Sequence, residues 1–286
     1  MKDSRKNRFE IDESEVALPM YGKTLRMGHI ISRESKKMCI VPLDHGTTLG
    51  PIGGISNYLD TIRSIINGGA DAIVVHKGLL KNIAACPDVA RGNYIMHMSV
   101  STILSEDPSH KVLVATVEEA VKLGAVGVSL HVNLESAYET EMIKDFGKVS
   151  NACLDWGMPL LAMSYACKSG KNVKNITHAA RLAEELGADI IKVDYPGSSE
   201  GVKEVVSCVQ APVIIAGGSK CEKTEEILDI IHCSVTAGAS GVAIGRNIFQ
   251  SKHPKLTTEC IVGLINGEIS LHECKYRLGE FKERPA

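Results

Sequence analysis

The sequence predicts an α/β fold, a closed (β/α)8 TIM barrel with an N-terminal extension and extra C-terminal helices. Eight short apolar runs alternate with segments of helical spacing across residues 31–252. Strands that alternate with helices form parallel βαβ units, and eight such units close into a barrel. The chain has 286 residues. Because one barrel commonly takes about 250 residues, we expect a single domain with appendages at both ends.

Four strands are expected in the first half of the chain, each a short run of β-branched and other apolar residues. The helix between the first two has apolar residues at helical spacing and stops at Gly68 and Gly69. The strands span 38–46, 70–78, 93–100 and 126–133, with helices expected at 55–69 and 117–125.

The second half repeats the alternation more regularly. Strands are expected at 160–165, 188–197, 211–218 and 240–247, and helices at 136–156, 173–187, 198–209 and 222–237. The tail, 253–286, is expected to add one or two helices to the same domain over 254–281. Residues 1–30 are charged and carry no sustained periodicity beyond a short turn near GKTLRMGHII. They are expected to pack outside the barrel or to lack order before Leu18.

The composition argues against nucleic acid and membranes as binding partners and indicates a cellular compartment. Hydrophobic residues make up 44% and charged residues 23%, and the formal net charge is -2, so neither nucleic acid nor an anionic membrane is expected as a partner. No apolar run approaches the roughly 20 residues that span a bilayer, and the N-terminus lacks the apolar core of a signal peptide. The nine cysteines are scattered without a CxxC pair, so a reducing cytoplasm is expected.

The run ADIIKVDYPG, residues 188–197, places Lys192 between apolar residues in the sixth strand. Burial penalises the charged form of a lysine and can lower its pKa by several units, which leaves a neutral, nucleophilic amine. Such an amine can form a Schiff base with a ketone. The alternative stays open that Lys192 lies at the strand's end and reaches water or pairs with Asp194.

Two further side chains are expected beside that amine, because active sites in this fold lie at the C-terminal ends of the strands. Asp44 follows the first strand in the run DHG, and Tyr165 ends the fifth. If both point inward, a carboxylate, a phenol and an amine meet in one cavity, which is the minimum for imine chemistry. The alternatives are a turn cap for Asp44 and a core role for Tyr165.

Glycines and an arginine at the ends of the last two strands predict a phosphate site. The runs are AGGS and GRN, and the loops after strands seven and eight are the recurrent phosphate site of this fold. The candidates are Gly217, Gly218, Gly245 and Arg246, with Ser219 as a further donor. Tight-turn glycines and a surface arginine are the alternative.

Several long segments, in order, resemble one family of enzymes. They read PLDHG, VVHKG, KVLVATVEEAVKLGA, GVSLHVN, WGMPLLAMSY, ADIIKVDY, APVIIAGGSK and GVAIGRNIFQ. The chain resembles the DeoC/archaeal-type class I aldolase family, which includes archaeal fructose-bisphosphate aldolases, from about residue 20 to 250. Within it the likeness is greatest to the 2-amino-3,7-dideoxy-D-threo-hept-6-ulosonate synthase branch and its secondary-metabolite relatives.

The resemblance implies a Schiff-base lysine at Lys192, a general acid/base at Tyr165 and a functional aspartate at Asp44. It places phosphate on the glycines of AGGS and on the GR of GRN, and it implies a homo-oligomer built on pentamers, often a decamer. Two departures lie beside the catalytic positions: SYACKSG stands where the family usually has MYPRG, and strand six continues as KVDYPGSS where the family usually has KT.YTGD. They leave the identity of the substrates open.

The sequence, with this resemblance, therefore predicts a class I aldolase or transaldolase that needs no cofactor and acts on a phosphorylated keto sugar. Aspartate semialdehyde is a candidate acceptor, and the identity of the acceptor stays open. Three alternatives stay open: a fructose-bisphosphate aldolase, a thiolase-like enzyme that handles a phosphorylated dione with coenzyme A, and a barrel that binds a phosphorylated metabolite without turnover. The pathway, whether biosynthetic or catabolic, also stays open.

The histidines are harder to interpret from sequence. His45 either contacts substrate or braces the loop beside Asp44. For His76, His97 and His131 a buried ring with a backbone partner is the favoured interpretation, with a place in the cavity open for one of them. The His and Cys positions have no ligand-like spacing, so no metal is expected and a zinc-dependent class II aldolase is disfavoured.

Overall fold

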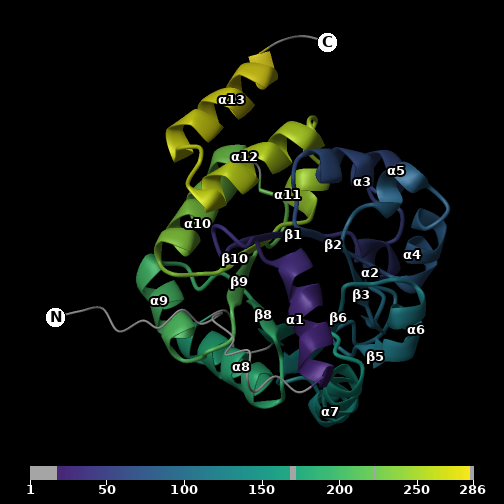
Figure 1. Cartoon of the computed structure of the whole chain (residues 1–286). Helices are drawn as coiled ribbons and strands as arrows, with labels where there is room; N and C mark the ends of the chain where they lie inside the picture. Colours follow the sequence, from purple (N-terminus) through teal and green to yellow (C-terminus); the bar gives the residue numbers. More distant parts are fainter. Residues whose placement is uncertain (1–17, 168–171, 222, 284–286) are drawn as a thin grey trace.

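The computed structural model describes residues 18–167, 172–221 and 223–283 and forms a closed eight-stranded barrel (Figure 1). Its strands are β1 (Met38–Pro42), β2 (Ala72–Val75), β3 (Tyr94–His97), β6 (Gly127–Leu134), β7 (Leu160–Ala166), β8 (Ile190–Val193), β9 (Val213–Ala216) and β10 (Gly241–Ala243). Around the barrel they follow the order β1-β10-β9-β8-β7-β6-β3-β2, and each neighbouring pair is parallel. The predicted fold class and all eight predicted strands are confirmed.

Helices form the outer ring of the barrel (Figure 1). They are α3 (Tyr58–Asn67), α4 (Lys77–Ile83), α5 (Pro87–Ala90), α6 (Val117–Lys122), α7 (Glu139–Asp155), α8 (Val173–Glu185), α9 (Ser199–Ser207) and α10 (Thr224–Thr236). Local caps fix several of their starts: Thr116 and Glu119 form a capping box on α6, and Ser198 accepts from Gly201 at α9. Two short helices, α2 (His45–Leu49) and α11 (Arg246–Phe249), follow β1 and β10 directly.

The core has two layers. Inside the barrel lie inward-facing side chains of alternate strand positions, among them Ile40, Val74, Leu161, Ile190 and Ile214. Between strands and helices lies a larger apolar cluster that contains Val41, Val75 and Ile191. Since neighbouring residues of a strand point to opposite faces, the inward set continues in steps of two from Ile190 to Lys192. The alternation of the sequence thus decides which polar side chains can enter the barrel.

The N-terminal segment is more ordered than the short turn that we expected. Residues Leu18–Ile30 form the helix α1, which crosses the barrel at the N-terminal ends of the strands (Figure 1). The amine of Lys23 donates to both carboxylate oxygens of Asp189 at 3.1 and 2.9 Å, and Arg26 donates to the carbonyl of Gly157. The helix therefore covers the end of the barrel opposite the predicted site, while the predicted extension before Leu18 lies outside the described residues.

A small hairpin interrupts the barrel pattern after β3. The predicted strand 93–100 is split at Met98 into β3 and the short strand β4 (Ser99–Val100), which pairs antiparallel with β5 (Val112–Leu113). The hairpin stands at the C-terminal ends of the strands, since Met98 follows His97 at the end of β3 and its carbonyl accepts from Val114. It carries residues 101–111 to the same end of the barrel as the predicted active site.

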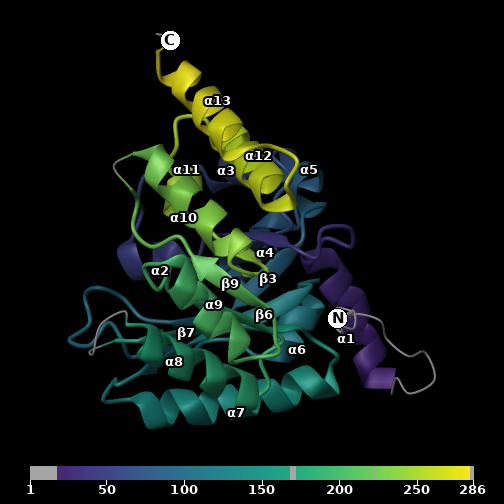
Figure 2. The same ribbon diagram turned by 90° about the vertical axis from the view of Figure 1, so that its left-hand side faces the viewer.

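The tail folds into the two helices α12 (Pro254–Asn266) and α13 (Leu271–Glu283). Helix α12 packs against α3 and α10, and α13 packs against α10 and α12 and extends away from the barrel (Figure 2). The chain turns out of α12 at Gly267, whose φ of 75° is left-handed and suits a glycine at this helix end. Within the described ranges, no helix combines the length and the apolar character that crossing a membrane requires.

Candidate active site

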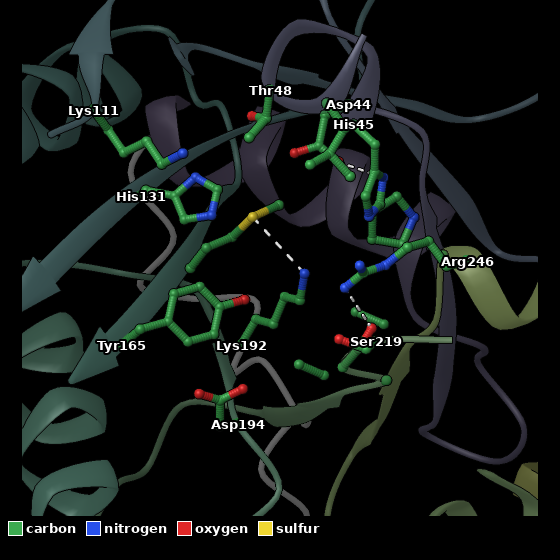
Figure 3. Close-up of a pocket in the computed structure, with 18 residues that line it drawn as sticks. Asp44, His45, Thr48, Lys111, His131, Tyr165, Lys192, Asp194, Ser219 and Arg246 are labelled. Carbon is green, nitrogen blue, oxygen red and sulfur yellow. Dashed lines mark hydrogen bonds and ion pairs between the residues drawn. The ribbon is translucent and has the colours of Figure 1, made fainter. Parts of the chain in front are cut away.

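A cavity of about 350 Å³ opens at the C-terminal ends of the barrel strands (Figure 3). This volume falls within the range of small-molecule sites. Its wall brings together all nine predicted site residues: Asp44, His45, Tyr165, Lys192, Gly217, Gly218, Ser219, Gly245 and Arg246. The inward faces predicted for the first, fifth and sixth strands are therefore correct.

Lys192 occupies the wall of this cavity from β8, with 8% of its surface exposed. Its Nζ atom lies 3.9 Å from the Sδ atom of Met163 on the adjacent strand, and both side chains face inward. Burial lowers the pKa of Lys192, and the positive charge of Arg246 lowers it further, whereas Asp44 and Asp194 oppose the shift. A lower pKa raises the fraction of neutral amine, the nucleophilic form, at a given pH.

Asp44 lies between β1 and α2, where the chain leaves the barrel. Its carboxylate oxygens lie 3.7 Å from Nε2 of His97 and 3.6 Å from Nδ1 of His45. Burial alone would raise the pKa of Asp44, but the basic groups around it, with His97 and His45 first, outweigh burial and hold the pKa well below its usual range. The carboxylate is therefore ionised near neutral pH and can accept a hydrogen bond from a substrate hydroxyl and orient it.

Tyr165 stands near the end of β7 and directs its hydroxyl toward Lys192 (Figure 3). Burial raises the pKa of the phenol well above its usual value, and the negative charges of Asp194 and Asp44 add to the effect. The phenol therefore keeps its proton over the physiological range. A protonated phenol beside an amine can donate that proton to a departing hydroxyl group.

The loops after β9 and β10 line one side of the cavity. A Cβ atom on Gly245 would lie 2.8 Å from the carbonyl oxygen of Pro42, and Gly218 has a left-handed φ of 63°, so both positions favour glycine. The Nη2 atom of Arg246 donates to the carbonyl of Gly218 at 3.0 Å. Its buried Nε atom has no hydrogen-bond partner among the described residues, which leaves a donor available for a ligand.

Asn247 holds these two loops together and was not predicted. Its Nδ2 atom donates to the carbonyls of Gly217 and Ser219 at 3.3 and 3.1 Å, and its Oδ1 atom accepts from the backbone of Cys221. The residue is buried. Its side chain thus fixes the loop after β9 against α11, and a single sequence offers no signal that distinguishes such an asparagine from a surface one.

His45 lines the cavity, as one of its two interpretations requires, and its ring packs edge-on to Phe249 with centroids 5.2 Å apart. Burial lowers the pKa of His45, although Asp44 raises it. Its Nδ1 atom is buried without a hydrogen-bond partner among the described residues. Because Nδ1 lies 3.6 Å from Oδ1 of Asp44, the ring stands beside this carboxylate as well as lining the cavity.

Of His76, His97 and His131, it is His131 that lines the cavity, with its ring centroid 5.6 Å from that of Tyr165. Behind it, Nε2 of His97 lies 3.1 Å from Nδ1 of His131, and Nδ1 of His97 lies 2.8 Å from the hydroxyl of Ser129. Burial lowers the pKa of both histidines, to about 3 for His97. The favoured interpretation, a backbone partner for each ring, holds for His76, whose Nδ1 lies 3.1 Å from the carbonyl of His97. It is wrong for His97, whose two ring nitrogens pair with the side chains of Ser129 and His131.

One of the two departures from the family pattern reaches the cavity. Asp194, from the KVDYPGSS run, lines it, and Cys167, from SYACKSG, lies exposed beyond β7. Residues 168–170 of that run lie outside the described residues. Lys111 and Thr48 also line the cavity and were not predicted. In the ranges 18–167, 172–221 and 223–283, no group of three or more His, Cys, Asp or Glu side chains is placed to hold a metal ion.

A parallel (β/α)8 barrel whose strand ends bring a buried amine, a protonated phenol and an ionised carboxylate into one cavity has the site of an imine-forming enzyme. The comparison with known proteins agrees. The family model for DeoC/LacD family aldolases matches residues 38–251. The chain belongs to this aldolase family, and it is a class I aldolase, as predicted.

Relatives and solved structures cover most of the chain. The 2-amino-3,7-dideoxy-D-threo-hept-6-ulosonate synthase 1 of Archaeoglobus fulgidus is 40% identical over 255 residues, which cover 89% of this chain and 95% of the relative. The 2-amino-4,5-dihydroxy-6-oxo-7-(phosphonooxy)heptanoate synthase of Streptomyces griseus is 34% identical, with 86% and 91% covered.

One solved structure, of an archaeal fructose-1,6-bisphosphate aldolase with its catalytic Lys covalently bound to the carbinolamine intermediate of the substrate, is 26% identical to this chain. It superposes with a TM-score of 0.78 and covers 86% of this chain and 100% of its own. The barrel is therefore shared over nearly the whole length of that enzyme.

Proposed function

We propose that Lys192 forms a Schiff base with the ketone of a phosphorylated keto substrate, and that the enzyme then makes a carbon–carbon bond to an aldehyde. The observation that carries this proposal is the position of Lys192: a lysine only 8% exposed, with a lowered pKa, on the wall of the barrel cavity beside Tyr165 and Asp44. A structural lysine gains nothing from such a place, because burial disfavours its charge.

The proposed reaction uses the three groups in order. The neutral amine of Lys192 adds to the ketone carbon and gives a carbinolamine. Tyr165 donates its proton to the hydroxyl, which leaves as water, and a protonated imine remains. This cation withdraws electrons, so the neighbouring carbon can lose a proton and the resulting enamine attacks the aldehyde. Asp44 supports these proton transfers, and hydrolysis of the imine releases the product and restores the free amine.

The phosphate of the keto substrate is proposed to bind between the loops after β9 and β10. The buried Nε of Arg246 has no protein partner in the described ranges, and Gly218 has open space where a side chain would begin. Ser219 lines the same edge of the cavity. A phosphate held at these loops, away from the reacting carbon, orients the ketone toward Lys192 and lowers the entropic part of the activation barrier.

The names of two relatives indicate the carbon skeleton. Both are synthases of seven-carbon compounds that bear an amino group on C2, and the Streptomyces griseus relative makes one with a keto group at C6 and a phosphate on C7. A bond between C4 and C5 divides that skeleton into a four-carbon amino acid aldehyde and dihydroxyacetone phosphate, with the ketone where an imine is needed. We therefore propose aspartate semialdehyde as the acceptor.

Borohydride trapping tests this function. Reduction in the presence of dihydroxyacetone phosphate should add the mass of the reduced adduct to the Lys192 peptide and abolish activity, whereas Lys192→Met should take up no label at that peptide. An unlabelled Lys192 in a folded protein that binds the ketone would contradict the proposal and favour a barrel that binds phosphorylated metabolites without turnover.

The same preparation separates the related activities. Condensation with aspartate semialdehyde that exceeds cleavage of fructose 1,6-bisphosphate is the expected result. Faster cleavage of the bisphosphate, or a reaction that requires coenzyme A and a phosphorylated dione, would assign the enzyme to one of the other two activities instead.

We further propose that the enzyme works in a reducing cytoplasm as a homo-oligomer built on pentamers. All nine cysteines are free thiols, which supports a reducing compartment. Exposed apolar residues on α1, including Met20 and Leu25, support an interface between copies. Light scattering coupled to size exclusion should give a mass that is a multiple of five chains, and a monomer would contradict this part of the proposal.

A further inference from the structure

Lys111 lies in the active-site cavity without a role in the chemistry described so far. It comes from the loop between β4 and β5 and, among the side chains drawn in Figure 3, reaches into the cavity from the side opposite Arg246. The topology explains this arrangement. In the barrel order, β3 and β6 lie directly across from β9 and β10. A residue carried by the hairpin after β3 therefore faces the proposed phosphate loops across the width of the barrel.

The loop that carries Lys111 is held by several hydrogen bonds. The hydroxyl of Ser101 donates to the carbonyl of Pro108 at 2.6 Å, and Asn133 at the end of β6 donates to the carbonyl of Ser109 at 2.6 Å. The backbone of His131 donates to the hydroxyl of Ser99 at 2.9 Å. These bonds fix both arms of the hairpin to β6, so the position of Lys111 is set by the barrel.

The amine of Lys111 keeps capacity for a ligand. It donates to the hydroxyl of Ser101, and an ammonium group has three donors. Burial lowers the pKa of Lys111, while Asp44 raises it, and an arriving anion would favour the charged form in the same way. The cavity thus has a basic side chain at each side, Lys111 and Arg246, with Lys192 and Tyr165 on the strands between them.

We propose that Lys111 binds the carboxylate of the acceptor aldehyde and so determines the preference for an anionic acceptor. This inference rests on the proposed function: with the phosphate at Arg246 and the ketone carbon at Lys192, the acceptor must approach from the remaining side of the cavity, where Lys111 lies. The carbonyl carbon of a four-carbon amino acid aldehyde would then face the enamine, and its carboxylate would face Lys111. Charge-assisted hydrogen bonds of this kind add both affinity and orientation.

The test compares acceptors that differ in charge, with dihydroxyacetone phosphate as the donor. The acceptors are aspartate semialdehyde, its carboxamide analogue, in which a neutral amide replaces the carboxylate, and glyceraldehyde 3-phosphate. We expect Lys111→Met to lower kcat/KM for aspartate semialdehyde at least tenfold, which is the effect of losing one hydrogen bond to a charged group. The value for the carboxamide should change less than threefold, and Lys111→Arg should restore most of the loss.

Two controls keep the result interpretable. Borohydride trapping of dihydroxyacetone phosphate at Lys192 should be unchanged in Lys111→Met. This result would show that the fold and the part of the cavity that binds the ketone are intact. Lys77→Met alters a lysine outside the cavity that pairs with Glu119 at 3.1 Å, and it should leave all three acceptors unaffected.

Several results would overturn the inference. One is an equal loss of kcat/KM for the charged and neutral acceptors in Lys111→Met, and another is no loss for aspartate semialdehyde. A parent enzyme that prefers the carboxamide would also contradict it. A loss confined to glyceraldehyde 3-phosphate would assign Lys111 to a second phosphate instead. Absence of trapping at Lys192 in the parent enzyme would instead refute the proposed function.

Discussion

The Nζ atom of Lys192 lies 3.9 Å from the Sδ atom of Met163, its register partner on the neighbouring strand β7. A thioether is a weak, uncharged acceptor, so this contact stabilises an ammonium group far less than a carboxylate at the same place would. The strand register thus places an apolar, polarisable neighbour beside the one lysine whose neutral form the proposed chemistry needs.

The pH dependence of imine formation should reflect this environment. Because burial lowers the pKa of Lys192, the rate of borohydride-trapped imine formation should rise with pH and level off below the pH at which a free lysine deprotonates. Asp44 raises the pKa of Lys192, so Asp44→Asn should move the inflection to still lower pH while it lowers the maximal rate. Borohydride trapping quenched at timed intervals over a series of pH values measures both the inflection and the maximal rate. An inflection that moves upward in Asp44→Asn would contradict this electrostatic account.

Tyr165→Phe should slow the loss of water from the carbinolamine. General acid catalysis contributes about a hundredfold or more, so we expect a fall of this order in kcat together with accumulation of the carbinolamine adduct in intact-mass spectra. Tyr195→Phe is the matched control, because its hydroxyl lies outside the cavity, 3.3 Å from the Sγ atom of Cys233. Comparable losses in both variants would argue against a special role for Tyr165.

Arg246→Met should discriminate between phosphorylated and unphosphorylated donors. Loss of the guanidinium removes its charge-assisted bonds to the phosphate, so kcat/KM for dihydroxyacetone phosphate should fall about a hundredfold, whereas the low activity with dihydroxyacetone should change little. Because Arg246 also lowers the pKa of Lys192, the inflection of imine formation should move to higher pH. An equal loss with both donors would place the phosphate elsewhere.

Lys23→Met should weaken the fold at the other end of the barrel. Lys23 is 9% exposed and pairs with Asp189 at 2.9 Å, so we expect a loss of about 1–3 kcal/mol in the free energy of unfolding. Burial raises the pKa of Asp189 and Lys23 lowers it. The pair stabilises only the ionised carboxylate, so the loss should be larger at pH 7 than at pH 4.

Urea unfolding of the parent, of Lys23→Met and of Lys148→Met measures the effect. Lys148 is 74% exposed and pairs with Asp145, so its replacement should cost about 0–1 kcal/mol. The same small cost in both variants would mean that the Lys23–Asp189 pair contributes little to stability.

Much of the barrel could be predicted because its signals are local. Apolar runs with period two and helices that end at glycines, such as the one before Lys192 at Gly187, identify strands and helices without knowledge of their packing. The same alternation predicted that Lys192, Tyr165 and Asp44 share the inward face. Helix α1 was underestimated because its order depends on contacts over more than a hundred residues, such as those of Lys23 with Asp189 and of Arg26 with Gly157.

The unpredicted part of the site comes from loops and from long-range contacts. Lys111 belongs to a hairpin whose strands are two residues long, too short for a periodic signal. His131 enters the cavity because His97 and Ser99 orient its ring and backbone from β3 and β4. Asn247 acts through carbonyls of a loop 28 to 30 residues away. Such partners are set by tertiary geometry, which a single sequence does not show.

A crystal structure of the enzyme soaked with dihydroxyacetone phosphate tests the central claim most directly. We predict continuous electron density between the Nζ atom of Lys192 and the ketone carbon, with the phosphate against Arg246. Bound dihydroxyacetone phosphate whose ketone is not bonded to Lys192, or is bonded to Lys111 instead, would contradict it.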